Sequence, residues 1–143
     1  MPAPVIVYQR ELTLNPEEFI DVLQRSTLAE RRPVTDTGRI AEMLQHANLI
    51  VTARIDGRLI GVSRALTDFA FCTYLSDLAV DEAYQHRGIG ARLIYETKKH
   101  SPQAKLILLA APKATGYYPK VGMSHFEHCF ILDDAEKMLL KQI

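Results

Sequence analysis

Two glycines at a strand-to-helix junction constrain the fold of this chain more than any other feature. Residues 84–93 read YQHRGIGARL; they follow the β-rich run FAFCTYLSDLAV and open the amphipathic run IGARLIYETKKH. Glycine permits left-handed backbone conformations, and helix N-termini leave backbone N–H groups unpaired. Gly88 and Gly90 therefore predict a turn whose amide groups converge on one point, and such a point can bind an anion.

Two nucleotide-binding patterns do not fit this turn. The dinucleotide pattern Gly-x-Gly-x-x-Gly requires a third glycine where Leu93 stands, and the chain has no Gly-Lys-Ser/Thr of a phosphate-binding P-loop. Two interpretations stay open at this point. Either the glycines only permit a tight turn, or the turn binds the phosphates of a different ligand.

The hydrophobic pattern predicts a mixed α/β fold with one sheet and helices on its faces. A helix should begin at Asn15-Pro16 and break at Pro33, and Asp56-Gly57 should join two strands as a hairpin. The other predicted elements are a strand at 4–14, a helix starting near 35 or 36, a strand at 69–80, a helix at 89–100, a central buried strand at 105–111, a short helix or turn at 114–123, a strand at 124–132 and a last helix at 133–143.

Composition limits the classes of protein that this chain can be. Its 143 residues are 48% hydrophobic, which predicts one domain over residues 1–143. Seventeen basic and seventeen acidic residues argue against a non-specific nucleic-acid binder. The chain has two cysteines far apart in sequence, no apolar run of membrane-spanning length and no leader-like N-terminus. These features predict a cytoplasmic protein that does not enter a membrane, and the even charge predicts that it does not bind nucleic acid.

Two short motifs, in the same order along the chain, resemble those of the GNAT superfamily of acyl-coenzyme A-dependent N-acetyltransferases. Gln85, Gly88 and Gly90 match the cofactor motif Gln/Arg-x-x-Gly-x-Gly/Ala, and residues 114–122 are similar to the later aromatic-Tyr-x-Lys-x-Gly segment. Pro119 and Met123 depart from the second motif, and the asparagine that many members carry after the fifth strand is absent from LLAAPKAT. The resemblance implies a mostly antiparallel sheet that splays between its fourth and fifth strands.

The resemblance also implies a site for acetyl-CoA. The pantetheine arm would pair with the backbone of Leu78, Ala79 and Val80. The pyrophosphate would bind in the turn, whose residues are Gln85, His86, Arg87, Gly88, Ile89, Gly90 and Ala91. Arg92 would add positive charge beside it.

Tyr118 matches the family position whose hydroxyl gives a proton to the departing thiolate; the alternative is an aromatic packing pair with Tyr117. Strand alternation would place Asp77 on the same face as Leu75 and Ala79, and Asp77 is a candidate base; the alternatives are a structural aspartate or a water chain in its place. By family analogy Arg31 and Arg32 would bind the acceptor, unless they only form a solvated loop. His125 and His128 would face opposite sides of a strand, so no metal site is expected.

The resulting hypothesis is an enzyme that transfers an acetyl group from acetyl-CoA to a primary amine in a ternary complex. A small-molecule amine is the favoured acceptor and a protein amine the second choice, and family members often form homodimers. Two alternatives stay open: a coenzyme A-binding sensor or scaffold without catalysis, and a transferase for a longer acyl group.

Overall fold

The computed structural model describes residues 3–140 and contains two compact units, Met1–Leu109 and Ala110–Ile143. The first unit holds β1 (Val7–Glu11), α1 (Pro16–Ser26), the 3-10 helix η1 (Leu28–Arg31), α2 (Thr37–His46), β2 (Leu49–Ile55), β3 (Arg58–Thr67), β4 (Cys72–Val80), η2 (Glu82–Tyr84), α3 (Ile89–His100) and β5 (Lys105–Leu108). The second holds η3 (Pro112–Ala114), α4 (Tyr117–Lys120) and η4 (Ala135–Lys137). The single-domain prediction stays a prediction.

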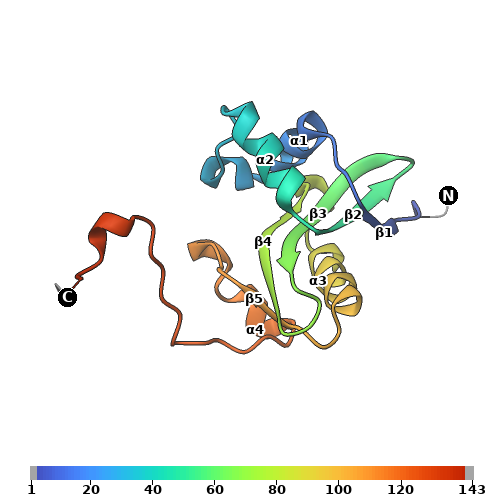
Figure 1. Ribbon diagram of the computed structural model, residues 1–143. Coiled ribbons are helices and arrows are strands. Elements are labelled where there is room, and N and C mark those ends of the chain that lie inside the picture. Colours follow the sequence, from blue (N-terminus) through green and yellow to red (C-terminus); the bar gives the residue numbers. More distant parts are fainter. Residues whose placement is uncertain (1–2, 141–143) are drawn as a thin grey trace. The chain divides into compact units, whose positions relative to one another are not determined.

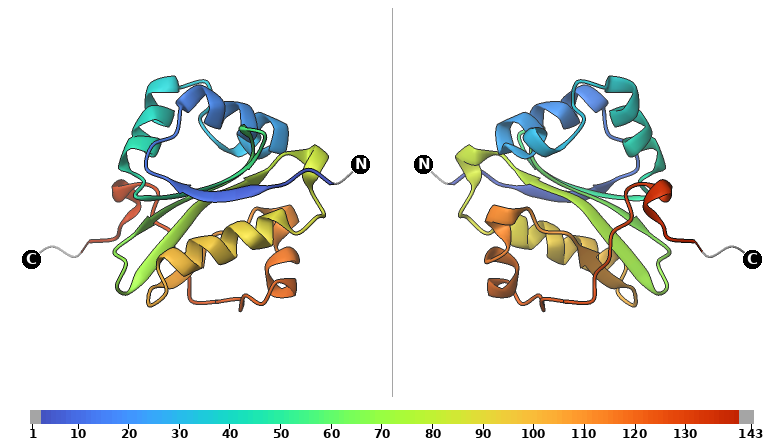
Figure 2. Two further views of the ribbon diagram at one scale, coloured as in Figure 1. Left: turned by 90° about the vertical axis from the view of Figure 1, so that its right-hand side faces the viewer. Right: turned by 90° about the vertical axis from the view of Figure 1, so that its left-hand side faces the viewer.

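The five described strands form one sheet in the order β1-β2-β3-β4-β5. All neighbours are antiparallel except β4 and β5, which run parallel. Helices α1 and α2 cover one face of the sheet and α3 covers the other (Figures 1 and 2). The predicted mixed α/β fold, with a mostly antiparallel sheet and helices on both faces, is therefore confirmed.

Local signals set several element boundaries as predicted. The Asn15 side chain accepts hydrogen bonds from the backbone of Glu17 (2.8 Å) and Glu18 (3.2 Å), and so caps α1. Asp56 (φ 49°) and Gly57 (φ 81°) are both left-handed, as a two-residue hairpin turn between β2 and β3 requires. Helix α1 ends at Ser26 rather than at Pro33, because Thr27 turns left-handed (φ 72°).

Two apolar cores hold the layers together. One lies under α1 and α2, where Phe19, Leu23 and Ile40 are fully buried against the sheet. The other lies under α3, where Ile89 and Leu93 are buried against the opposite face. Burial of each such side chain stabilises the fold by about 1.5–3 kcal/mol. The first turn of α3 is therefore anchored to the sheet next to the end of β4.

Two sequence predictions about strands are wrong. Strand β5 is an edge strand among the described residues, not a central one, and its side chains alternate between exposed and half-buried. The predicted strand at 124–132 is absent: these residues belong to no helix or strand, and Phe126 and Phe130 are exposed. A strand needs a partner edge, which propensity alone does not supply.

The predicted last helix is reduced to one turn. The Asp134 side chain accepts a hydrogen bond from the backbone of Glu136 (3.0 Å), which caps only η4. A single turn gains few hydrogen bonds for the backbone entropy it costs. Residues 141–143 of the predicted helix lie outside the described residues.

Candidate active site

The sheet opens between β4 and β5. Their parallel pairing starts at Cys72 with Lys105 and ends at Leu75 with Leu108. Strand β4 continues to Val80, still paired with β3 on its other side. From residue 76 to residue 80, one edge of β4 therefore has no strand partner among the described residues. The predicted splay is present, and an extended ligand can pair with this edge of β4 up to the Val80 carbonyl, which already accepts from the Gln85 amide (2.9 Å).

A β-bulge in β4 lies where the two strands part. Arg64 of β3 pairs with Asp77, but its neighbour Ala65 pairs with Leu75, so Ser76 is the extra residue. The bulge reverses the strand parity that the sequence suggested. Leu75 is buried in the α3 core, whereas Ala79 is buried in the core under α1 and α2.

The glycine turn is closed against the end of β4. The Gln85 amide donates to the carbonyl of Val80 (2.9 Å), and the Asp81 carboxylate accepts from the backbone of Ala83 (2.9 Å). His86 (φ 64°) and Gly88 (φ 82°) are both left-handed, and Gly88 caps the N-terminus of α3. Alternating left-handed residues point successive amides to one side of the chain.

The amides of this turn have no internal partners. The backbone N–H groups of residues 86–91 donate to no other group in the described part of the chain. A Cβ atom added at Gly88 would meet no heavy atom within 4 Å, so the space in front of the turn is open. These donors and the positive end of the α3 dipole suit a phosphate group.

Two arginines flank the turn. The Arg87 guanidinium stacks over the Tyr84 ring at 5.4 Å from its centroid, and its side chain is exposed. Arg92, on the first turns of α3, pairs with Glu96 (2.9 Å) and stacks over Tyr8 at 5.5 Å. Both guanidinium groups are held by contacts that an incoming anion can share.

Asp77 is fully buried on the α1 side of the sheet and pairs with two arginines. One carboxylate oxygen accepts from Arg32 and the other from Arg64. This is the structural environment that the sequence analysis left open as an alternative, and the base role of Asp77 stays a prediction. Arg64 was missed; its charge inside the apolar run GVSRAL was a signal for a buried acidic partner.

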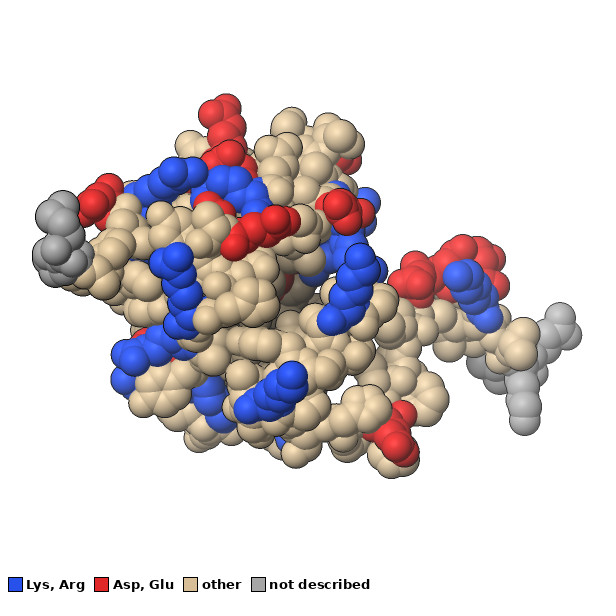
Figure 3. Space-filling model, turned by 180° about the vertical axis from the view of Figure 1, so that it is seen from behind, with Lys and Arg blue, Asp and Glu red and all other residues tan. Residues whose placement is uncertain are grey.

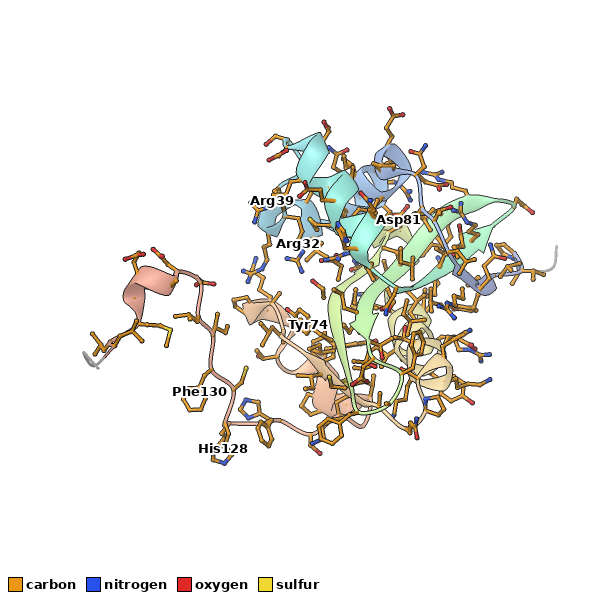
Figure 4. All side chains as sticks on the ribbon, viewed as in Figure 1. Arg32, Arg39, Tyr74, Asp81, His128 and Phe130 are labelled. Carbon is orange, nitrogen blue, oxygen red and sulfur yellow. The ribbon has the colours of Figure 1, made fainter. Side chains whose placement is uncertain are left out.

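The two arginines predicted to bind the acceptor differ in their surroundings. Arg32 comes from the connection between α1 and α2 and extends toward β4 (Figure 4). Its guanidinium bonds Asp77, the carbonyl of Ser76 (2.8 Å) and the carbonyl of Arg31 (2.8 Å). The Arg31 side chain is exposed. All guanidinium nitrogens of Arg32 thus bond to groups of the protein, and of these two arginines only Arg31 has an exposed side chain.

An open groove of about 690 Å³ runs along the first half of β4, on the α2 side of the sheet. Its mostly apolar lining includes Tyr74 of β4 (Figure 4) and Ile107 of β5, which are partners in the strand register. The next pair along, Leu75 with Leu108, is the last before the strands part. The groove therefore ends one strand pair before the opening of the sheet.

Tyr118 lies on α4 in the second unit. Its ring packs edge-on against Tyr117, with centroids 5.2 Å apart and planes at 81°. The side chain is half-buried, and this burial, together with Tyr117, raises the pKa of the Tyr118 hydroxyl above its ordinary value of 10.0. The hydroxyl therefore stays protonated at neutral pH, the state that an acid needs.

Surface charge, candidate metal ligands and helix hydropathy bear on the other kinds of site considered from the sequence. Acidic and basic side chains lie side by side on the face seen in Figure 3. Residues 3–140 contain no cluster of three or more His, Cys, Asp or Glu side chains suited to a metal ion. No helix in the described part of the chain has the length and apolar character needed to cross a bilayer.

Solved structures of acetyltransferases share this fold. A GNAT-family acetyltransferase from Streptococcus pneumoniae matches with a TM-score of 0.73 at 19% identity, over 91% of this chain and 100% of that chain. A probable acetyltransferase from meticillin-resistant Staphylococcus aureus matches with a TM-score of 0.72 at 20% identity, over 96% and 100%. An aminoglycoside N-acetyltransferase in complex with CoA matches with a TM-score of 0.71 at 16% identity, over 94% and 97%.

The sequence itself matches a family model across most of its length. The model describes the acetyltransferase (GNAT) family and covers residues 13–123, which include the opening of the sheet, the glycine turn and Tyr118. The resemblance noted from two short motifs is therefore confirmed over the whole of β2 to α4. The chain belongs to the acetyltransferase (GNAT) family.

Proposed function

We propose that this protein transfers an acetyl group from acetyl-CoA to a primary amine by direct transfer in a ternary complex. One observation carries the proposal: the unpaired amides of residues 86–91 lie directly after the unpaired edge of β4. A pyrophosphate bound to those amides would direct the pantetheine arm along Leu78, Ala79 and Val80. Acetyl-CoA supplies the acyl thioester.

The reaction needs a proton donor for the departing thiolate and a group that removes the proton of the amine. Tyr118 is the proposed donor to the departing thiolate, a role that comes from the family resemblance and is supported by the raised pKa of its hydroxyl. Both oxygens of Asp77 already accept guanidinium hydrogen bonds, which argues against Asp77 as the base. We therefore assign removal of the amine proton to water that leads to solvent.

The acceptor is proposed to be a small-molecule amine that lies in the groove beside Tyr74 and Ile107. The groove supports this proposal because its volume is that of a small-ligand site and because its lining ends at Tyr74 and Ile107, one strand pair before β4 and β5 part. The apolar side chains of the lining suit an apolar body on the amine, and the Asp68 carboxylate at the edge of the groove suits its positive charge. A protein amine remains the alternative acceptor.

Calorimetric titration with acetyl-CoA, followed by a thiol-release assay across a panel of primary amines, tests the function. We expect micromolar binding and turnover with one class of amine. Binding without turnover on small amines or peptides would instead identify a coenzyme A sensor. Faster turnover with a longer acyl-CoA would replace the acetyl assignment. Failure of the folded protein to bind acetyl-CoA would overturn the proposal.

A further inference from the structure

The bulge at Ser76 is held by side chains as well as by the sheet. The Ser76 carbonyl accepts from Arg32 (2.8 Å), and the Ser76 hydroxyl accepts from Arg64 (2.9 Å). Both arginines also pair with Asp77, the next residue along the strand. Two adjacent residues of β4 are thus bound by two guanidinium groups at the point where β4 parts from β5.

The two arginines approach this bulge from different parts of the fold. Arg64 belongs to β3, the strand paired with the bulge, and is buried. Arg32 comes from the connection between α1 and α2, and its side chain keeps 22% of its surface exposed. Its remaining bond goes to the carbonyl of Arg31 in that connection. Arg64 also donates to the carbonyl of Met43 in α2 (3.1 Å), so the two arginines tie the bulge to two different segments outside the sheet, α2 and the α1–α2 connection.

The chemistry of arginine suits this bridging role. Its planar guanidinium offers several donors in a fixed fork, whereas lysine offers one compact charge. In Arg32 the Nε donor goes to Asp77, one terminal nitrogen to the Ser76 carbonyl and the other to Arg31. A lysine at this position could neutralise Asp77 but could not reproduce the fixed fork that bonds Asp77 and the Ser76 carbonyl at the same time.

We propose that Arg32 is a positioning residue, which holds the Ser76 bulge of β4 so that the edge of Leu78, Ala79 and Val80 stays open for the pantetheine arm. The inference rests on the proposed function. It gives Arg32 a different role from that of binding the acceptor, and it makes Asp77 the anchor of Arg32 rather than a base.

Arg32→Lys tests this role, with Arg54→Lys as the matched control. Arg54 of β2 also bonds through all its guanidinium nitrogens, to Glu11, Glu18 and the carbonyl of Gly57, but it lies away from β4. We expect both variants to unfold at lower temperature than the parent protein. Arg32→Lys alone should raise the KM for acetyl-CoA about tenfold or more, as expected from one lost charge-assisted hydrogen bond.

A second readout does not depend on catalysis. Amide hydrogen exchange in residues 76–80, without ligand, should become faster in Arg32→Lys and stay unchanged in Arg54→Lys. An Asp77→Asn variant should keep the shape of the pH profile of kcat, because a carboxylate that only anchors Arg32 takes up no proton during turnover. If the variant instead loses the fall of kcat at low pH, Asp77 is the base.

The outcomes separate this inference from the proposed function. If the parent protein does not bind acetyl-CoA, the proposed function fails and the positioning role falls with it. If the parent protein turns over but Arg32→Lys keeps its KM for acetyl-CoA and its exchange rates, the inference alone is overturned. A raised KM for the amine with an unchanged KM for acetyl-CoA would also overturn it, and would return Arg32 to acceptor binding.

Discussion

Gly88 and Gly57 form a natural pair for testing what the glycine turn does. Their backbones are nearly identical, with φ of 82° and 81°, and a Cβ atom at either would meet nothing within 4 Å. Gly88 starts α3, whereas Gly57 lies in the hairpin between β2 and β3. Replacing each by alanine changes the same backbone property at two different places.

The expected loss of stability is the same for both variants. An L-residue in the left-handed region costs about 1–2 kcal/mol, and the stiffer unfolded chain returns about 0.4–1 kcal/mol. With no clash to add, Gly88→Ala and Gly57→Ala should each destabilise the protein by about 1 kcal/mol. The midpoint temperature of thermal unfolding should fall by about 4 °C in each variant.

Only Gly88→Ala should weaken acetyl-CoA binding. Its methyl group would occupy the space in which we place the pyrophosphate, and denying the phosphate one charge-assisted N–H bond costs about 1.5–3 kcal/mol. The Kd in a calorimetric titration should therefore rise about 10-fold to 100-fold, while Gly57→Ala binds like the parent protein. If Gly88→Ala also binds like the parent, the turn is only a turn and the reasoning is wrong.

Three further changes test other parts of the structure. Tyr118→Phe should lower kcat about 10²-fold to 10⁴-fold in a thiol-release assay and leave the Kd for acetyl-CoA unchanged; an unchanged kcat would remove Tyr118 as the acid. Hydrogen bonds from the backbone of Phe71, Ala70 and Cys72 hold the pKa of Asp68 at about 2, below its ordinary 3.8. The contribution of these hydrogen bonds to the free energy of unfolding should be present above about pH 4 and be lost as the pH falls through about 2. Asp68→Asn should abolish this pH dependence in urea denaturation. Gly61→Ala should destabilise the protein by about 1–3 kcal/mol in the same assay, because its Cβ would lie 3.1 Å from Leu93 Cδ1 and 3.4 Å from the Ala79 carbonyl; equal stability would mean that the α3 core can relax.

Much of the fold was predictable because its signals are local. Asn15 caps a helix and Asp56-Gly57 turns a hairpin through bonds and dihedral angles within a few residues of each other. The glycine turn was recognised in the same way, since the φ of Gly88 and the free amides after it depend only on the chain near them. These are properties that a short sequence window contains.

Three of the failed predictions concern contacts between distant segments or between strands. The run at 105–111 reads as a central strand, yet strand position depends on which neighbours pair with it, and β5 has one. The run at 124–132 has the composition of a strand, but composition does not provide a partner edge. The parity of Asp77 was misjudged because one extra residue in a strand moves every later side chain to the opposite face.

The sequence by itself determined the family and the glycine turn, because each rests on a few consecutive residues whose backbone geometry is set locally. Only the tertiary structure decided what Asp77 and Arg32 contact. Their pairing joins positions 45 residues apart and depends on the Ser76 bulge. Sequence spacing carries no record of such a contact, since it exists only once the α1–α2 connection has packed against the sheet.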